Sequence, residues 1–317
     1  MPLQDAYIWS VVILSMHDAN GDSYPIGTAF AVLFDRNHYL VTARHVVDHG
    51  LPVFARRRKL DKETDEVSVG PWRWHPDEDV AVAALPDWDR WPWELGYIPE
   101  ASFLPERPED SQLMLGQDIL FIGLLRNLPP MALEGIPMVR SGSLGRLNQK
   151  NVPLRITKDR LDHLTAHLID CRAYQGMSGA PCFSQRLLVR AQHDQQTGEP
   201  ITLRTETYLI GLVSGNFDEK APVHKSLAQT FGLAIPIHTG VGIVTPVRFI
   251  RETLNDPVFI KDRVEKEQEQ RTEQLDINTE ATASSDQPDV GRTADLMSKL
   301  LQVPKNEADE VHRGHEG

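Results

Sequence analysis

Short runs of Val, Ile, Leu and aromatic residues recur along most of this chain, and they constrain its fold more than any other feature. Turn sequences such as DANGD, FDRNH, SGNFDE and HTGVG bound most of these runs, and few helical patterns lie between them. Many short strands with turn residues between them are typical of β-sandwiches and β-barrels. The pattern therefore predicts an all-β fold. Between residues 6 and 244 the runs are YIWSVVIL, GTAFAVLF, HYLVTA, VAVAAL, DILFIGLL, HLIDC, YLIGLVSG and GVGIVTP.

A predicted helix ends the strand pattern, and the composition changes after it. Pro246 suits a first helical position behind a Thr245 cap, and apolar residues then recur at helical spacing as far as Leu254. Residues 257–317 are charged and rich in Gln and Ser, which predicts a short helix followed by a flexible, largely disordered tail. An apolar island interrupts this tail, and its residues 293–303 form either a transient helix or a helix that docks a regulatory protein partner.

The net charge of -12 argues against two classes of partner. Nucleic acids and anionic membrane surfaces are bound through clustered Lys and Arg. The one basic run, residues 56–59, is followed after a single leucine by the sequence DKETDE, which predicts a solvated hairpin. No stretch approaches the roughly 18 apolar residues that a membrane-spanning helix needs. We therefore expect neither a nucleic acid nor a membrane as partner.

Cysteine usage and the N-terminal sequence indicate the compartment. Cys171 and Cys182 are the two cysteines, too few for a disulfide framework, and they fit a reducing compartment. The apolar opening AYIWSVVILS follows Asp5 rather than a basic residue and lacks a small-x-small cleavage site. It therefore predicts a first strand rather than a signal peptide, and we expect a cytoplasmic protein.

The sequence YQGMSGAPCF places a serine in a sharp bend. Glycine permits backbone conformations that other residues avoid, so Gly176 and Gly179 allow a bend that exposes the hydroxyl of Ser178 and directs amide groups to one point. A plain surface turn can use the same residues. A serine hydroxyl is also a weak nucleophile until a base takes its proton, so the bend by itself leaves both interpretations open.

A candidate base and its partner occur earlier in the chain. His45, in LVTARHVVDH, follows a predicted strand and a small-residue step, so its ring can face a cleft from a fixed backbone. Asp79, in HPDEDVAVAALP, immediately precedes an alternating strand, where its carboxylate can reach a neighbouring imidazole. Asp77 is the alternative, and Asp79 is preferred because the strand follows it directly. The chain order is then His45, Asp79, Ser178.

Three segments in this order resemble those around the active site of chymotrypsin-like (trypsin-fold) serine proteases. They are GTAFAV with LVTARHVV, then DEDVAVAAL, then GMSGAP. The segments GQDILFIGLL and PMVRSGSLGRL are similar to the start of the second barrel in stand-alone bacterial trypsin-like peptidases and in the protease domain of Deg-type proteases. GVGIVTPVRFI is similar to the last strand and closing helix. The resemblance covers roughly residues 6–256.

This resemblance implies a fold of two perpendicular six-stranded antiparallel β-barrels. Residues 1–105 would form the first barrel, which carries His45 and Asp79. Residues 106–256 would form the second barrel, which carries Ser178 and the closing helix. Residues 257–317 would follow as the charged tail.

The resemblance also implies a serine endopeptidase that needs neither a cofactor nor a metal. Ser178 would attack the peptide carbonyl, His45 would take its proton and later give it to the leaving amine, and Asp79 would orient the imidazole. The backbone N–H groups of Gly176 and Ser178 would form the oxyanion hole.

Substrate contacts follow from the same resemblance. LIGLVSGN is similar to the strand that pairs with substrate, so Ser214, Gly215 and Asn216 are expected to bind an extended peptide or protein substrate through backbone hydrogen bonds. Arg172 would fall near the pocket for the residue that precedes the cut. An inward charge there favours acidic side chains, whereas an outward one leaves Tyr174 and the VSG strand to favour small or apolar ones. A solvated Arg172 is the third alternative.

Three further residues near the predicted site have other interpretations. Met177 replaces the acidic residue that pairs with a new N-terminal amine in the digestive members of the family, so activation by propeptide removal is not expected. His163 and His167 are four residues apart, a spacing that binds metal on a helix. They lie in a predicted strand without a third ligand, which favours structural roles.

Three functions remain after these observations. The first is an active serine endopeptidase, which a partner could gate through the tail of the chain. The second is a catalytically silent module on the same fold that binds peptides without cutting them. The third is an esterase-like hydrolase with the same residues, which the peptide-pairing strand disfavours.

Overall fold

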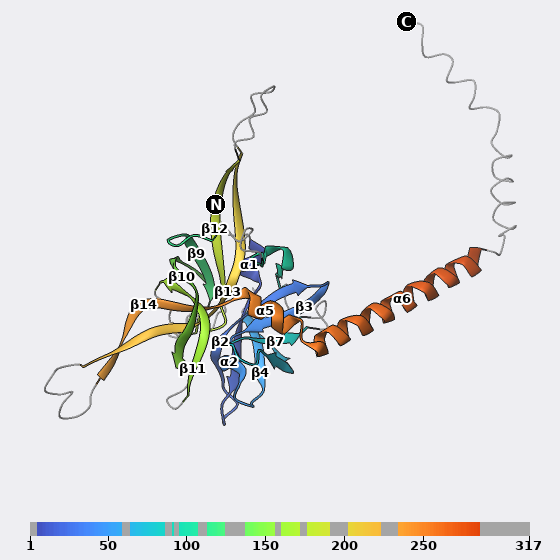
Figure 1. Cartoon of the computed structure of the whole chain (residues 1–317). Helices are drawn as coiled ribbons and strands as arrows, with labels where there is room; N and C mark the ends of the chain where they lie inside the picture. The colour runs from blue at the N-terminus through green and yellow to red at the C-terminus, as the bar shows by residue number, and fades with distance from the viewer. Residues whose placement is uncertain are drawn as a thin grey trace, which may run out of the picture. The chain divides into compact units, whose positions relative to one another are not determined.

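Two β-sheets and a few helices make up the computed structural model of the chain (Figure 1). The structure describes residues 5–58, 64–85, 91, 95–106, 113–123, 137–155, 160–171, 176–190, 202–222 and 234–285. Residues 1–259 form one compact unit and residues 260–317 a second. None of the described helices is long and apolar enough to cross a membrane.

The first sheet takes all its strands from the N-terminal part of the chain. Its order is β5-β4-β1-β2-β3-β7-β6, and β8 pairs in parallel with β2. The strands are β1 (Val11–His17), β2 (Ser23–Phe34), β3 (Asn37–Thr42), β4 (Val53–Arg58), β5 (Thr64–Val69), β6 (Trp72–Trp74), β7 (Ala81–Ala84) and β8 (Ile98–Pro99).

The second sheet is a closed barrel of six strands in the order β10-β11-β14-β13-β12-β9. Its longest strand, β13, pairs with β12 from Thr202 to Leu212 and with β14 from Gly211 to Pro222. The strands are β9 (Asp118–Gly123), β10 (Met138–Arg155), β11 (Leu161–Asp170), β12 (Pro181–Arg190), β13 (Thr202–Pro222) and β14 (Ala234–Pro246).

The prediction of an all-β fold built from two barrel-like sheets is confirmed. Within the described residues the second sheet has the six strands expected of it, whereas the first sheet has eight. The difference lies in the short strands β6 and β8, which are three and two residues long and add to six longer ones.

Helices are few and lie mainly at the two ends of the described chain. They are α1 (Asp5–Trp9), α2 (Arg44–Val47), the 3-10 helix η2 (Glu100–Ser102), α5 (Val247–Leu254) and α6 (Pro257–Ser285). The predicted closing helix is α5, and it begins one residue later than expected because Pro246 caps it from an extended conformation.

The N-terminal residues differ from the prediction of a strand from the start of AYIWSVVILS. Residues Asp5–Trp9 are helical, and the strand begins at Val11. The hydroxyl of Tyr7 lies 2.7 Å from Ser102 Oγ, and the Tyr7 ring stacks on Phe183 at 5.1 Å. These contacts join the segment to residues far apart from it in sequence.

The helix after α5 also differs from the prediction, since α6 runs for 29 residues rather than forming a short helix. Residues 286–317 lie outside the described residues, and so does the predicted docking helix at residues 293–303.

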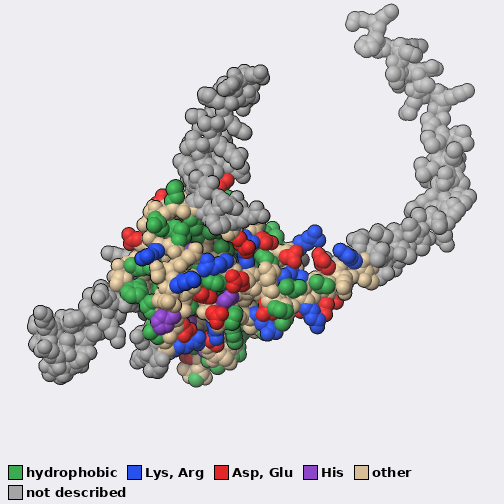
Figure 2. All heavy atoms as spheres, viewed as in Figure 1, with side chains coloured by type: hydrophobic (Ala, Val, Ile, Leu, Met, Phe, Trp, Pro, Cys, Tyr) green, Lys and Arg blue, Asp and Glu red, His purple; other side chains and the backbone are tan. Residues whose placement is uncertain are grey.

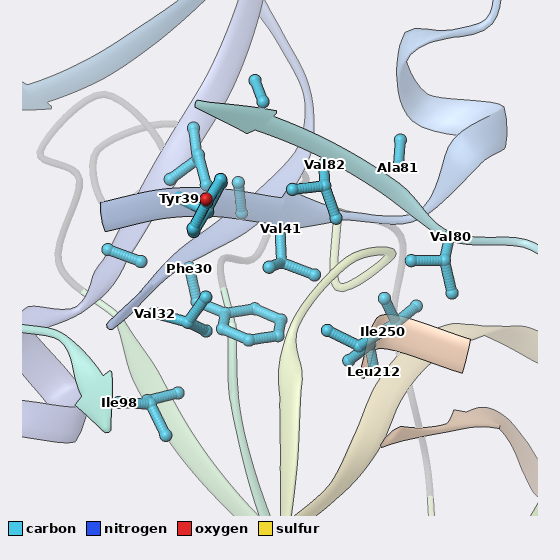
Figure 3. Packing of buried hydrophobic residues seen from close by; sticks show 14 of the residues in the cluster. Phe30, Val32, Tyr39, Val41, Val80, Ala81, Val82, Ile98, Leu212 and Ile250 are labelled. Carbon is cyan, nitrogen blue, oxygen red and sulfur yellow. The ribbon is translucent and has the colours of Figure 1, made fainter. Parts of the chain in front are cut away.

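One hydrophobic core joins the first sheet, the barrel and α5. In Figure 3, Leu212 of β13 and Ile250 of α5 lie close to Val80 and Val82, at the start of β7. All four side chains are buried, and full burial of such a side chain stabilises the fold by about 1.5–3 kcal/mol. The start of β7 is therefore held against both the barrel and the closing helix.

The surface carries charges of both signs. On the face shown in Figure 2, Lys and Arg side chains lie among Asp and Glu side chains. The hairpin predicted around the basic run is formed by β4 and β5, in which Arg56 pairs with Glu66.

Candidate active site

Strand register brings His45 and Asp79 to the same end of the first sheet. β3 and β7 are antiparallel neighbours, with Thr42 opposite Ala81. One residue separates the end of β3 from the short helix α2, which carries His45, and one residue separates Asp79 from the start of β7. Antiparallel pairing places the end of one strand beside the start of the next, so the two side chains meet.

The Asp79 carboxylate holds His45 by three hydrogen bonds. The Nδ1 atom of His45 lies 2.9 Å from Asp79 Oδ2 and 3.1 Å from Oδ1, and the backbone N–H of His45 donates to Oδ1 at 3.0 Å. Because an ionised carboxylate can only accept, Nδ1 carries the proton and Nε2 is left as the acceptor. The ring is therefore in the tautomer that can take a proton at Nε2.

The electrostatics of this pair favour an ionised Asp79. Burial disfavours the imidazolium of His45, but the charge and hydrogen bond of Asp79 outweigh it and raise the pKa of His45 above 6.5. Burial likewise opposes ionisation of Asp79. The charge and hydrogen bonds of His45, with a smaller contribution from Ser214, nevertheless lower the pKa of Asp79.

The turn that carries Ser178 is bound to the first sheet. The backbone N–H of Thr28, on β2, donates to the carbonyl of Ser178 at 2.9 Å, and the Thr28 hydroxyl donates to the carbonyl of Gly176 at 2.7 Å. Thr42 in turn donates its hydroxyl to the carbonyl of Thr28 at 2.7 Å. Since Thr42 ends β3, the Ser178 turn lies against the strand end from which His45 follows.

Close packing and positive φ angles explain the glycines of this turn. Gly176 has φ +98° and Gly179 has φ +85°, values that side chains rarely adopt. A methyl group at Gly179 would collide with the carbonyl oxygen of Thr28 and the hydroxyl of Thr42. Met177, between them in the turn, is fully buried in the barrel core and so anchors it by packing.

Ser178 itself is partly exposed. Within the described part of the chain no hydrogen bond joins its hydroxyl to His45, and neither the Gly176 nor the Ser178 N–H donates a hydrogen bond.

The predicted substrate strand is part of β13. Gly215 pairs with Ile243 and Asn216 with Gly242 of β14, while pairing with β12 ends at Leu212. Ser214 differs from its two neighbours because its side chain is buried and its Oγ lies 2.6 Å from Thr245 Oγ1. The sequence suggested only backbone contacts for Ser214, and the structure also brings its hydroxyl to Asp79.

The structure separates the remaining candidates. Arg172 and Tyr174 lie outside the described residues. The side chain of Asp77 is exposed, and Asp79 is the carboxylate that reaches His45. His163 and His167 lie on β11 as expected, with His163 exposed and His167 buried.

His167 and the cysteines are buried without a place in the site. The Nδ1 atom of His167 accepts from the N–H of Asn148 at 3.1 Å, and burial followed by the charge of Arg248 lowers the pKa of His167 to about 4. Cys171 and Cys182 are both buried thiols, and burial raises the pKa of Cys182. Among the described residues, no group of three or more His, Cys, Asp or Glu side chains forms a metal site.

Sequence reasoning missed Thr28. Its hydroxyl and N–H hold the Ser178 turn, although 150 positions separate it from Ser178. The available signal was a hydroxyl residue in the otherwise apolar run GTAFAVLF.

Comparison with known proteins adds a family match. The model of the trypsin-like peptidase domain matches residues 27–189, a range that contains His45, Asp79 and Ser178. A search of curated proteins found no match.

Solved structures similar to this chain are distant in sequence. The apo MamO protease domain from Magnetospirillum magneticum is 17% identical, with 80% of this chain and 100% of that chain covered and a TM-score of 0.49. The active form of the Rv3671c protease from M. tuberculosis is 17% identical, with coverages of 80% and 82% and a TM-score of 0.46. The serine endoprotease from Yersinia pestis is 16% identical, with coverages of 80% and 65% and a TM-score of 0.44.

Proposed function

Since this chain belongs to the family of trypsin-like peptidase domains, we propose that it is a serine endopeptidase in which His45, Asp79 and Ser178 act together. The observation that carries the proposal is the 2.9 Å contact between His45 Nδ1 and Asp79 Oδ2, which leaves Nε2 as an acceptor. The bonds from Thr28 to the Ser178 turn support it further, because they hold the hydroxyl-bearing residue beside the strand end that precedes His45.

The proposed reaction proceeds through an acyl-enzyme. Ser178 Oγ attacks the peptide carbonyl while His45 Nε2 takes its proton, and the imidazolium then protonates the leaving amine. Water, activated by His45 in the same way, hydrolyses the ester. Asp79 keeps the ring in the required tautomer and stabilises the imidazolium. The N–H groups of Gly176 and Ser178 stabilise the oxyanion, and one such donor is typically worth about 3 kcal/mol in the transition state.

The substrate would be a peptide or protein bound as an added strand. The β13 backbone pairs with β14 at Gly215 and Asn216, and its pairing with β12 ends at Leu212. An extended peptide can add to such a sheet as a short strand, with Ser214, Gly215 and Asn216 as its proposed contacts. Arg172 and Tyr174 remain our candidates for contacts with the residue that precedes the cut, by way of an inward charge or an apolar pocket.

Labelling with a fluorophosphonate tests the proposal, with intact mass as the readout. We expect one adduct on the full chain, none on Ser178→Ala, and a strongly slowed reaction on His45→Ala. Equal labelling of Ser178→Ala and the unsubstituted chain would show that the nucleophile has been misidentified. A folded chain that takes no adduct would contradict an active site in this state.

The second candidate is a peptide-binding module without catalysis. It is favoured by one observation: within the described residues, no hydrogen bond joins Ser178 to His45. Such a module would bind peptides equally well before and after the substitution Ser178→Ala, and would leave them intact. An endopeptidase would lose about 10⁶-fold in turnover on the same substitution.

Two further parts of the proposal concern regulation and location. A protein partner would gate activity through residues 293–303, and deletion of that segment would change the labelling rate.

We place the protein in the cytoplasm, because its two cysteines are buried thiols rather than a disulfide.

A further inference from the structure

The loop that precedes Asp79 begins with a buried histidine, His75, whose ring holds the loop by hydrogen bonds. His75 Nδ1 accepts hydrogen bonds from the backbone N–H groups of Asp77 and Glu78, at 3.2 and 3.1 Å. Because Nδ1 is an acceptor, Nε2 carries the proton, and it donates to Glu252 Oε2 at 2.9 Å. Glu252 belongs to α5, so the ring ties the loop to the closing helix.

A buried carboxylate fastens the same loop to the barrel. Both oxygens of Glu78 accept from the backbone N–H of Thr165 on β11, at 3.0 and 3.2 Å. The residue is 8% exposed, and burial raises the pKa of its carboxyl. Burying a carboxylate is costly unless its hydrogen bonds compensate, and the hydrogen bond here joins segments 87 positions apart.

In the chain, Asp79 lies between the hydrogen-bonded residues His75 and Glu78 and the buried residue Val80. Val80, the next residue, is fully buried and in Figure 3 lies close to Ile250 of α5. Arg44, beside His45, donates to the carbonyl of Pro76 at 3.2 Å. The barrel, α5 and α2 therefore all contact residues 75–79, and together they direct Asp79 toward His45.

We propose that Glu78 and His75 are positioning residues, which hold Asp79 where its carboxylate meets both the backbone N–H and the ring of His45. This inference rests on the proposed function, since it concerns the orientation of the base. Neither residue contacts the reacting atoms. Their effect is on geometry, and a displacement of about 1 Å at a reacting group typically costs about 10²-fold in rate.

Glu78→Ala and Glu78→Gln test the role of the carboxylate in the full chain, with Asp77→Ala as the matched control. Asp77 is an exposed carboxylate in the same loop. We expect Glu78→Ala to slow fluorophosphonate labelling by about 10²-fold and to lower kcat with little change in KM. The amide oxygen of Glu78→Gln can accept from Thr165, so the labelling rate of this variant should stay within a few-fold of that of the unsubstituted chain. The control Asp77→Ala should label as fast as the unsubstituted chain.

Two results would overturn the proposal. One is a folded Glu78→Ala protein that labels as fast as Asp77→Ala. The other is a Glu78→Gln protein as slow as Glu78→Ala, which would remove the hydrogen bond to Thr165 as the reason. If Glu78→Ala does not fold, Glu252→Ala decides, because it removes only a half-exposed acceptor of His75. Slower labelling at unchanged Tm then supports the proposal, and unchanged labelling contradicts it.

The nuclear magnetic resonance signal of the His45 Nδ1 proton separates this inference from the proposed function. A proton held between an imidazole and a carboxylate is strongly hydrogen bonded and gives its own downfield signal, whether or not the protein reacts. If the unsubstituted chain takes no label, the proposed function fails, yet the comparison remains informative. Loss of this signal in Glu78→Ala and its retention in Glu78→Gln support positioning, whereas an unchanged signal in Glu78→Ala refutes it.

Discussion

The carboxylate of Asp79 sets both the rate and the pH dependence that we expect of His45. His45 must be neutral to accept a proton, and Asp79 raises its pKa above 6.5. The labelling rate should therefore fall as the pH drops through the pKa of His45, which lies above 6.5. Asp79→Asn removes the charge that raises this pKa and leaves the burial that lowers it. The acidic limb of the pH–rate profile should therefore move to lower pH. The maximal rate should fall about 10⁴-fold, because the ring loses its tautomer.

Measuring the fluorophosphonate labelling rate between about pH 5 and 9 tests this expectation. Asp77→Asn is the control, since the side chain of Asp77 is exposed in the same loop. An acidic limb that stays in place in Asp79→Asn would show that the carboxylate does not set the pKa of His45.

His167 makes the fold sensitive to acid independently of the site. The pKa of His167 is about 4 in the folded chain, against the ordinary value of 6.5 for a histidine in the unfolded chain. As the pH falls below 6.5 the unfolded chain binds a proton that the buried ring does not, so the free energy of unfolding decreases. The loss should reach about 3 kcal/mol near pH 4.

Urea denaturation across this pH range measures the effect. His167→Gln should flatten the decline, whereas His163→Gln, at an exposed position on the same strand, should leave it unchanged. Parallel pH profiles for the two variants would assign the acid sensitivity to other groups.

Local sequence was enough to propose His45, Asp79 and Ser178, because each is flanked by a strand or a glycine bend. It was not enough for Thr28 or Glu78. Their partners are backbone groups of Ser178, Gly176 and Thr165, which any residue type can provide. A side chain that binds a distant main-chain atom leaves no pattern that identifies its partner, so such roles become visible only with the fold.

The Ser178 turn should tolerate no side chain at Gly179. Gly21 and Gly179 share nearly the same φ, +86° and +85°, but a methyl at Gly21 meets open space and one at Gly179 meets Thr28 and Thr42. Gly21→Ala should therefore cost only the strain of about 1–2 kcal/mol. Gly179→Ala should cost on the order of 3 kcal/mol or more and slow labelling, because the turn must leave β2. Denaturation midpoints and labelling rates check both, and equal costs would refute close packing as the cause.

The elements that sequence reasoning located best were those with apolar runs and clear turns, such as β3, β7 and α5. It misread α1, whose apolar residues look like a strand but whose Tyr7 packs on Phe183 of the barrel. It underestimated α6, whose charged residues suggested disorder although they also favour helix. At α1 packing overrides the strand-like pattern of the residues, whereas at α6 the helix propensity of the residues agrees with the observed helix.

The tail was predicted to begin at residue 257, but the first compact unit extends to residue 259 and so includes its first three residues. The burial of Phe259 explains this boundary. Phe259 is 4% exposed, belongs to the core of the first sheet, and packs edge-on against Tyr39 at 5.2 Å. Phe259→Ala should therefore lower the free energy of unfolding by about 3–5 kcal/mol. Ile260→Ala, next to it but 43% exposed, should change it by no more than about 0.5 kcal/mol.

Truncation separates this structural role from any regulation by the tail. A chain that ends at residue 256 loses Phe259 and should be as unstable as Phe259→Ala, whereas one that ends at residue 266 keeps it and should melt like the full chain. Labelling of the longer truncation then reports on the tail alone. A changed rate at unchanged Tm supports gating by the segment removed. Equal instability of the two truncations would instead show that residues beyond 266 stabilise the fold, and that Phe259 is not where the core ends.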